Sequence, residues 1–550
     1  MLLNGAQILI EVLAKQGVNT VFGYPGGAVL NIYDELYKSS DRIKHVITAH
    51  EQGAVHAADG YARASGKTGV VIATSGPGAT NLITGIANAY LDSVPMVAIT
   101  GNVPTSMLGK DSFQEVDIVD ITQSIVKHNF IVRDIKKLEK TLNEAFLIAS
   151  SGRKGPVLVD IPKNIQAEVC EYLNQEVTLK KNKKKPVKND FKRAIEIIKQ
   201  SKKPYIYCGG GIIAGNAEKE VFELSKKISA PIGFSMMGLS AVPSDYELNL
   251  GMCGMHGRYV ASKAQSEADL VIAVGVRFSD RATGNTEKYR EKCQVIHIDI
   301  DETEIDKNVK TKMGLCGDVK QILSEIIDKV PNFINPDWID EVKEYKKISA
   351  YQEDNNFNPK NIIETVSNYM NDDTVVATDV GQHQMWTVQH YKFKNTRTLL
   401  TSGGLGTMGY GFGAAIGGCF ANNKRKTVFF TSDGSFGMNL NEFATAVTQK
   451  LPLVIVVLNN GVLGMVRQWQ GMFYDKRFSE TTLERKTDFP MLAKAFGAKG
   501  FKVENLGELN EVLKNLKDDG PCLIDCIIGK DEKVLPMIPP GGSIKDIVIK

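Results

Sequence analysis

Residues 431–466 constrain the fold of this chain more than any other stretch. They join a short apolar strand, an acidic turn, a helix, a second apolar strand and an amide-rich turn. Residues 428–432 and 451–458 have the apolar character of buried parallel strands. Asp433 follows the first strand and Asn460 follows the second. Because parallel strands end at the same edge of a sheet, we expect Asp433 and Asn460 to lie side by side.

This pair of side chains predicts a metal site. A carboxylate and an amide oxygen, together with a backbone carbonyl and two phosphate oxygens, form the oxygen shell that Mg²⁺ prefers. The same pattern also fits a plain βαβ unit in which Asp and Asn are ordinary turn residues. Motifs elsewhere in the chain are needed to distinguish the metal site from the plain βαβ unit.

The whole chain alternates strand and helix patterns in three passes. A length of 550 residues is too great for one core. The pattern predicts an α/β fold of three consecutive Rossmann-like domains, each a mainly parallel sheet flanked by helices. The expected domains are residues 1–173, 190–335 and 358–550, with linkers at 174–190 and 331–360. The expected strands fall within residues 20–27, 45–49, 69–81, 94–104 and 155–165, then 204–211, 231–235, 269–278 and 294–301, then 374–381, 428–432, 451–458 and 521–529.

Composition narrows the class of protein. A formal net charge of +3 over 550 residues favours neither nucleic acid nor a membrane as a partner. The basic run at residues 180–188 is compatible with polyanion binding or with a solvated linker. The first residues have a helical pattern with interior charges, so we expect no signal peptide, and no apolar run is long enough to span a membrane. Eight cysteines without paired spacing indicate reduced, packed thiols in a cytoplasmic protein.

Several motifs resemble a known enzyme family. The DGS of residues 433–435, followed by Asn459 and Asn460, resembles the diphosphate-binding motif of thiamin diphosphate (ThDP) enzymes, although Ser432 stands where those enzymes usually have Gly. Residues 50–81 are similar to the pyrimidine-domain signature of the acetolactate (acetohydroxyacid) synthases and related ThDP decarboxylases and carboligases. The segments that resemble the acetohydroxyacid synthase catalytic subunit in particular are residues 110–115, 254–257, 276–281, 379–386, 402–411 and 464–470.

The resemblance implies an activity, cofactors and partners. The expected reaction decarboxylates pyruvate and joins the remaining two-carbon unit to a second pyruvate or to 2-ketobutyrate. The expected cofactors are ThDP, Mg²⁺ and FAD. The first domain would bind the pyrimidine, the central domain FAD, and the third domain, which includes a C-terminal tail, the diphosphate and Mg²⁺. The family also implies a homodimer or homotetramer with active sites at the interface, and a small regulatory subunit.

The resemblance also assigns roles to individual residues. Glu51 would activate ThDP, and Asp433, Asn460 and the Val462 carbonyl would bind Mg²⁺. The other expected catalytic residues are Gln114, Lys163 and Met408. The expected substrate residues are Phe113, Gln114, Lys163, Arg281 and Trp469. The expected cofactor-binding residues are Glu51, Gly381, Gln382, His383, Gly406, Met408, Gly434, Ser435, Met465, Gly254, His256, Gly275, Arg277, Asp299 and Asp318.

Each of these residues also has a plainer explanation. Glu51 fits an ordinary glutamate at a helix N-terminus, Met408 a core filler, Arg281 a surface arginine and Trp469 a packing residue. Other functions stay open as well: a pyruvate oxidase, a 2-ketoacid decarboxylase, a glyoxylate carboligase or a non-catalytic nucleotide-binding scaffold. The carboligase of glyoxylate is disfavoured because that enzyme lacks a glutamate at the position of Glu51.

Overall fold

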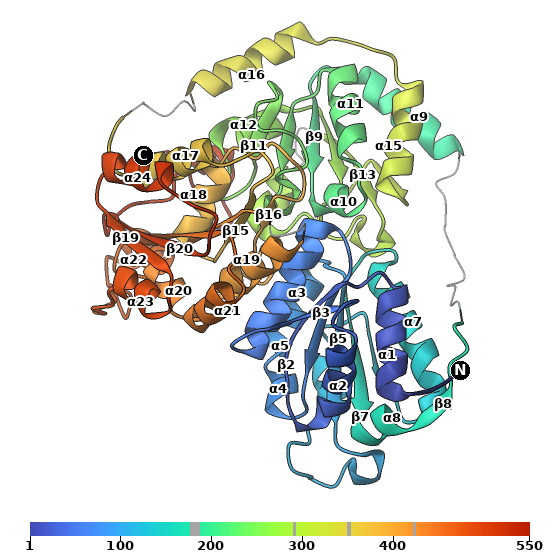
Figure 1. Ribbon diagram of the computed structural model, residues 1–550. Helices are drawn as coiled ribbons and strands as arrows, with labels where there is room; N and C mark the ends of the chain where they lie inside the picture. Colours follow the sequence, from blue (N-terminus) through green and yellow to red (C-terminus); the bar gives the residue numbers. More distant parts are fainter. Residues whose placement is uncertain (176–187, 290–292, 349–353, 422–424, 550) are drawn as a thin grey trace.

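Three parallel sheets form the framework of the molecule, as Figure 1 shows for the computed structural model. The structure describes residues 1–175, 188–289, 293–348, 354–421 and 425–549, so residues 180–187 of the basic run lie outside them. Each sheet has six strands, and all pairs within the three sheets are parallel. The expected α/β class with three Rossmann-like sheets is confirmed.

The first sheet, of order β3-β2-β4-β5-β7-β6, lies in the blue part of Figure 1. A short antiparallel ribbon, β1 (Leu2–Asn4) with β8 (Val169–Glu171), follows its edge. Its strands are β2 (Thr20–Tyr24), β3 (Lys44–Ile47), β4 (Gly69–Ala73), β5 (Met96–Asn102), β6 (His128–Ile131) and β7 (Pro156–Pro162). Its helices are α1 (Gly5–Lys15), α2 (Leu30–Lys38), α3 (Glu51–Ser65), α4 (Pro77–Thr80), α5 (Ile83–Leu91), α6 (Ile118–Thr122), α7 (Ile135–Ser150) and α8 (Lys163–Ala167).

The second sheet has the order β11-β10-β9-β12-β13-β14. Its strands are β9 (Pro204–Cys208), β10 (Ile232–Phe234), β11 (Asn249–Met252), β12 (Leu270–Val274), β13 (Gln294–Asp299) and β14 (Met313–Cys316). Its helices are α9 (Lys188–Gln200), α10 (Gly210–Ala214), α11 (Glu218–Ile228), α12 (Tyr259–Glu267), α13 (Asp280–Thr283), α14 (Thr286–Tyr289), α15 (Val319–Lys329) and α16 (Pro336–Ile348).

The third sheet, of order β16-β15-β17-β18-β20-β19, carries the Asp and Asn turns. Its strands are β15 (Val375–Thr378), β16 (Leu399–Leu400), β17 (Thr427–Thr431), β18 (Leu453–Asn459), β19 (Lys499–Val503) and β20 (Cys522–Ile527). Its helices are α17 (Pro359–Tyr369), α18 (Gln382–His390), α19 (Tyr410–Phe420), α20 (Asp433–Phe436), α21 (Phe443–Thr448), α22 (Gly464–Phe473), α23 (Phe489–Ala495) and α24 (Leu506–Lys514).

Two expected segments differ in the structure. The helix expected between the two apolar strands of residues 428–458, over residues 439–450, is a 3₁₀ turn, η5 (Leu440–Glu442), followed by the shorter α21. It ends early because Lys450 adopts a left-handed conformation, with φ of 48°. The expected linker at residues 331–360 contains α16, because Trp338 is buried and its Nε1 donates to the carbonyl of Pro204 at 3.0 Å.

The first and third domains share one hydrophobic core. A single cluster of buried side chains includes residues of both, such as Ala57 and Ala414. Helices α3 and α19 lie side by side at its centre (Figure 1). Glycines allow this contact, since a Cβ on Gly417 would overlap the carbonyl oxygen of Ala57, and one on Gly413 would lie 2.7 Å from the oxygen of Gly53. The two domains therefore meet backbone to backbone.

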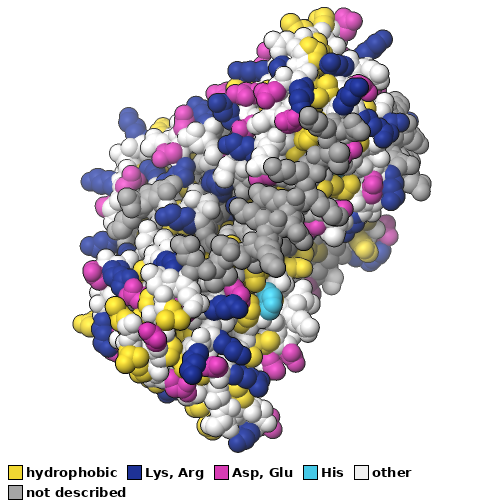
Figure 2. All heavy atoms as spheres, turned by 90° about the vertical axis from the view of Figure 1, so that its right-hand side faces the viewer, with side chains coloured by type: hydrophobic (Ala, Val, Ile, Leu, Met, Phe, Trp, Pro, Cys, Tyr) yellow, Lys and Arg dark blue, Asp and Glu magenta, His cyan; other side chains and the backbone are white. Residues whose placement is uncertain are grey.

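The surface and the cysteines agree with the composition. On the face in Figure 2, basic and acidic side chains are interspersed between uncharged ones. None of the eight cysteines, all of them described, forms a disulfide, and Cys522 and Cys526 are buried on the same strand. Among the described residues, no helix is both long and apolar enough to cross a membrane.

The α3–α19 contact yields a stability prediction. Gly417→Ala should lower the free energy of unfolding by about 1–3 kcal/mol, because the new methyl group has to displace the Ala57 backbone. Gly418→Ala, on the same helix, is the matched control, because the nearest neighbours of its methyl would be side-chain atoms, of Leu400 and Val375 at 3.0 Å and of Thr427 at 3.5 Å. Urea unfolding of both variants would measure the difference, and equal midpoints would contradict the packing argument.

Candidate active site

Asp433 and Asn460 lie at the ends of adjacent strands, as expected. Strands β17 and β18 pair in parallel up to Thr431 and Val457. Both side chains are buried, with exposed fractions of 8% for Asp433 and 7% for Asn460. Asn460 accepts a hydrogen bond from the N–H of Val462 at 3.2 Å and donates to Oε1 of Gln382 at 3.3 Å.

The Asp433 carboxylate has unused bonding capacity. Its Oδ1 is buried and has no hydrogen-bond partner among the described residues. Burial raises the pKa of Asp433 to about 6, against the backbone amides of Gly434 and Asn460, which lower it. A buried carboxylate oxygen without a donor is costly unless a cation satisfies it. The donor set of Asp433, Asn460 and the Val462 carbonyl therefore fits Mg²⁺.

The unusual Ser432 does not disturb this turn. Its φ of −125° is in the extended region, where glycine has no advantage. Its Oγ accepts a hydrogen bond from the N–H of Ser435 at 3.4 Å and so caps the short helix α20. The geometry thus accommodates serine in place of the usual glycine.

Other expected cofactor residues lie near this sheet edge. Gly381 precedes α18, whose first residues, Gln382 and His383, are buried. The Nε2 of His383 has no partner among the described residues, and burial lowers the pKa of this imidazole to about 3. Gly434 and Ser435 form part of α20, and Ser435 Oγ accepts from the N–H of Gly409 at 3.3 Å. A neutral buried histidine and small residues are suitable neighbours for a diphosphate.

Glu51 lies just beyond strand β3, as the first residue of helix α3. Its Oε2 accepts a hydrogen bond from Nδ2 of Asn81 at 2.9 Å. Its Oε1 lies 3.3 Å from the point where a Cβ on Gly78 would be, so the glycine turn before Asn81 leaves room for the carboxylate. The side chain is partly exposed. The strand end, the glycine turn and Asn81 thus fix one carboxylate at an open edge of the first sheet.

The expected substrate residues of the first domain lie on its surface. Gln114 packs against Gly76 and is exposed, as is Lys163 at the start of α8. Phe113 is 87% exposed. None of these three side chains, and neither Glu51 nor Met408, lines the large cavity described next.

A cavity of about 3160 Å³ lies where the three domains meet, and residues of all three line it. Strand-end turns of the central sheet form one wall, where Gly275 and Gly211 approach so closely that a Cβ on either would come within 2.5 Å of the other's Cα. Ten expected residues line the cavity: His256, Gly275, Arg277, Arg281, Asp299, Asp318, Gly381, Gly406, Met465 and Trp469. Gly254 lies beside it but is not part of the lining. The size and the glycine turns fit a dinucleotide such as FAD.

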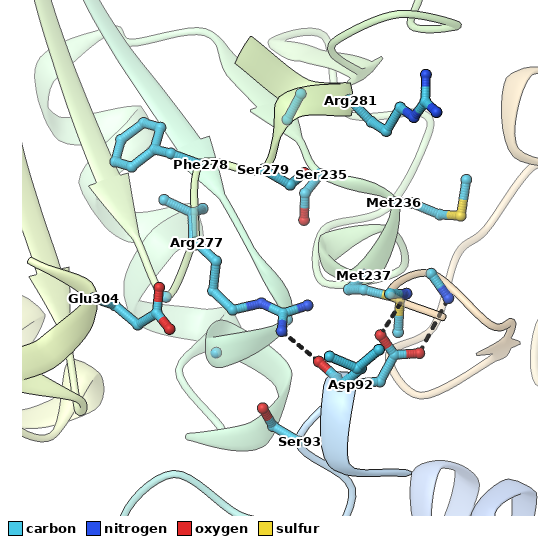
Figure 3. Close-up of a pocket in the computed structure, with 18 of the residues that line it drawn as sticks. Asp92, Ser93, Ser235, Met236, Met237, Arg277, Phe278, Ser279, Arg281 and Glu304 are labelled. Atoms are coloured by element: carbon cyan, nitrogen blue, oxygen red, sulfur yellow. Dashed lines mark hydrogen bonds between the residues drawn. The ribbon is translucent and has the colours of Figure 1, made fainter. Parts of the chain in front are cut away.

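Some polar side chains of the cavity already form hydrogen bonds within the protein, and others have shifted pKa values. Arg277 donates to the carbonyl of Leu91 at the end of α5, as Figure 3 shows. Asp318 caps helix α15 through the N–H of Gln321 at 3.1 Å. Burial raises the pKa of Asp299 to about 6 and lowers that of His256 to about 4. Both groups therefore favour their uncharged forms more than they would in water.

Arg281 and Trp469 meet across the cavity. The guanidinium carbon of Arg281 lies 5.7 Å from the centre of the Trp469 ring, which allows a cation–π contact. Arg281 comes from α13 of the central domain and Trp469 from α22 of the third. The Arg281 side chain is 62% exposed, and its Nε lies 3.6 Å from the Asp280 carboxylate. This arginine can receive an incoming carboxylate.

Sequence reasoning missed the residues that join the domains. Asp92, beyond α5, accepts hydrogen bonds from the N–H groups of Gly403 at 3.0 Å and Gly404 at 2.8 Å (Figure 3). It also binds Arg63, which pairs with Asp59. Asn81, the last residue of the motif at 50–81, also received no role from the sequence. A pairing between residues more than 300 positions apart leaves no local pattern that could have revealed it.

Comparison with known proteins places the chain among the thiamin enzymes. It matches the N-terminal, central and C-terminal domains of the thiamine pyrophosphate enzymes at residues 3–121, 191–326 and 379–526. It is 40% identical to the acetolactate synthase isozyme 3 large subunit of Escherichia coli, over 99% of this chain and 98% of that protein. It is 42% identical to the chloroplastic acetolactate synthase of Arabidopsis thaliana, over 99% and 84%.

A third relative, the acetolactate synthase large subunit of Lactococcus lactis, is 41% identical over 98% of this chain and 95% of its own length. Similarity of this degree extends through all three domains and includes the Asp433 and Asn460 turns and the Glu51 helix. The chain belongs to the family of acetolactate synthase large subunits, within the thiamine pyrophosphate enzymes.

Proposed function

We propose that this protein condenses two 2-ketoacids with loss of CO₂, as a step of branched-chain amino acid biosynthesis. Two pyruvate molecules give 2-acetolactate and CO₂, and pyruvate with 2-ketobutyrate gives 2-aceto-2-hydroxybutyrate and CO₂. The observation that carries the proposal is the full-length similarity to acetolactate synthase large subunits, with Asp433 and Asn460 paired at one strand edge.

The residues present support three proposed cofactors. ThDP, when bound, supplies a carbon nucleophile and accepts the electrons released as CO₂ departs. Asp433, Asn460 and the Val462 carbonyl would bind the Mg²⁺ of its diphosphate, and Gly381, His383 and Ser435 would surround that group. Met408 would support the ring system. FAD would occupy the cavity beside Arg277 and Asp299.

The protein residues then have separate tasks. Glu51 would hydrogen-bond the pyrimidine ring of the cofactor and exchange a proton with it, while Asn81 orients its Oε2. Arg281 would bind the carboxylate of a 2-ketoacid, and Trp469 would contact the side chain of the second substrate. Gln114, Lys163 and Phe113 would line the path by which substrate enters.

A product assay tests this function. The purified chain, incubated with pyruvate, ThDP, Mg²⁺ and FAD, should form acetolactate with one CO₂ released per two pyruvates. Omission of ThDP or Mg²⁺ should abolish the yield, and added 2-ketobutyrate should give the mixed product. Acetaldehyde as the main product would indicate a decarboxylase instead, and a flavin that becomes reduced with pyruvate under anaerobic conditions would indicate an oxidase.

Glu51→Gln should lower kcat by about 10²–10⁴-fold, because the amide cannot take part in proton transfer. Cofactor binding should persist, since the Mg²⁺ side of the site is unchanged. Steady-state kinetics and a ThDP fluorescence titration would measure both quantities. Glu11→Gln is the control, a helix glutamate paired with Arg42 at the surface. Full turnover in Glu51→Gln would contradict the assigned role.

A second copy of the chain would complete the site. Glu51 does not line the cavity that contains Arg281 and Trp469, and neither does Phe113, which is 87% exposed. Within one copy, these first-domain residues therefore lie outside that cavity. We expect a homodimer or homotetramer, in which the first domain of one copy faces the third domain of another. The family name also points to a small regulatory subunit, and the cytoplasm is the expected compartment. Sedimentation of the active enzyme should give at least the dimer mass, and a fully active monomer would contradict this arrangement.

A further inference from the structure

The segment before Glu51 is bound by a carboxylate from another domain. Glu442, in the turn η5 of the third domain, accepts hydrogen bonds from two successive backbone N–H groups. The N–H of Ala49 donates to its Oε2 at 3.2 Å, and the N–H of His50 donates to its Oε1 at 3.1 Å. Glu442 has no exposed surface. One side chain thus holds the two peptide groups that lead directly to Glu51.

The surroundings of Glu442 are shaped for this contact. Thr445 Oγ1 donates to its Oε2 at 2.7 Å. Gly53, in the first turn of α3, lies so close that a Cβ there would overlap Oε1 of Glu442. The carboxylate also lies at the N-terminus of α3, where the helix dipole stabilises negative charge. Burial raises the pKa of Glu442, whereas its hydrogen bonds with Thr445, Ala49 and His50 lower it.

The contact matters because it supports Glu51 at a second point, away from the tip of its side chain. Asn81 binds the tip of its side chain, and the backbone on its N-terminal side is held by Glu442. A displacement of about 1 Å in a reacting group costs on the order of 10²-fold in rate. The position of the Glu51 carboxylate therefore depends on the distance between the first and third domains.

We propose that Glu442 is a positioning residue, which sets the place of the Glu51 carboxylate by binding the N–H groups of Ala49 and His50. The inference rests on the proposed function, in which Glu51 exchanges a proton with the cofactor. It adds that the third domain controls this exchange within the same chain, through the stretch that also contains Asp433.

The test uses Glu442→Gln in the full-length protein with ThDP and Mg²⁺. The amide keeps the size of the side chain but can accept only one of the two hydrogen bonds. We expect kcat to fall about 10- to 100-fold, with the KM for pyruvate changed less than about twofold. The exchange of the cofactor's thiazolium C2 hydrogen with deuterium, followed by quenched-flow NMR, should slow by a similar factor at full ThDP occupancy.

Two further variants separate positioning from folding. Thr445→Val removes one donor to Glu442 but leaves Ala49 and His50 bound, so the exchange rate should stay within about twofold of the wild type. Gly53→Ala forces the carboxylate away without changing any ionisable group, and it should slow exchange as Glu442→Gln does. It also provides the test if Glu442→Gln does not fold.

Glu51→Gln, measured in parallel, distinguishes a failure of the positioning role of Glu442 from a failure of the proposed role of Glu51. One outcome is that Glu51→Gln slows the exchange, whereas Glu442→Gln and Gly53→Ala, both folded and loaded with ThDP, exchange at the wild-type rate. In that case the positioning role is wrong and the proposed function stands. If Glu51→Gln itself exchanges at the wild-type rate, the proposed role of Glu51 fails.

Discussion

The contact between helices α3 and α19 is the constraint on which the rest of the structure depends. Glycines at 60, 413 and 417 lack the side chains that would keep the two backbones apart. The first and third domains consequently share one core, although residues 174–358 separate them in the chain. Close packing of this kind has few alternative arrangements, since interiors respond even to the volume of one methyl group. It sets the relative position of the two strand edges that carry Glu51 and Asp433.

Buried carboxylates reinforce this contact from both sides. Glu442 of the third domain binds the N–H groups before Glu51, and Asp92 of the first domain binds the N–H groups of Gly403 and Gly404. The second contact fixes the glycine loop that leads to Met408. Each domain thereby holds the functional segment of the other. Arg277 adds a link from the cavity, because it binds the Leu91 carbonyl next to Asp92. The three domains are coupled through charge-assisted bonds to backbone groups, which are stronger than neutral ones.

Local pattern predicted the inner strands well and the edge strands poorly. Strands β6, β11, β14, β16 and β19, which the pattern did not reveal, all lie at sheet edges. An inner strand such as β18 is covered on both faces and is apolar almost throughout, whereas β19 alternates between exposed and buried residues. Similarly, the pattern of α16 is that of a linker, because Trp338 and Val342 are its only buried residues. Of the candidate site, the residues at strand ends were predictable, because a turn after an apolar run has a recognisable local form.

The sequence by itself therefore determined the three parallel sheets, the Asp433–Asn460 pair and the resemblance that singles out Glu51. These features depend on runs of neighbouring residues, and the period of apolar side chains reports them directly. Only the tertiary structure decided which side chains bind across domains, that Oδ1 of Asp433 lacks a partner among the described residues, and that Glu442 lies against Ala49 and His50. The physical reason is that these contacts join positions separated by hundreds of residues. Their geometry depends on how closely the glycine-containing helices α3 and α19 pack, and no local sequence pattern specifies the distance between these helices.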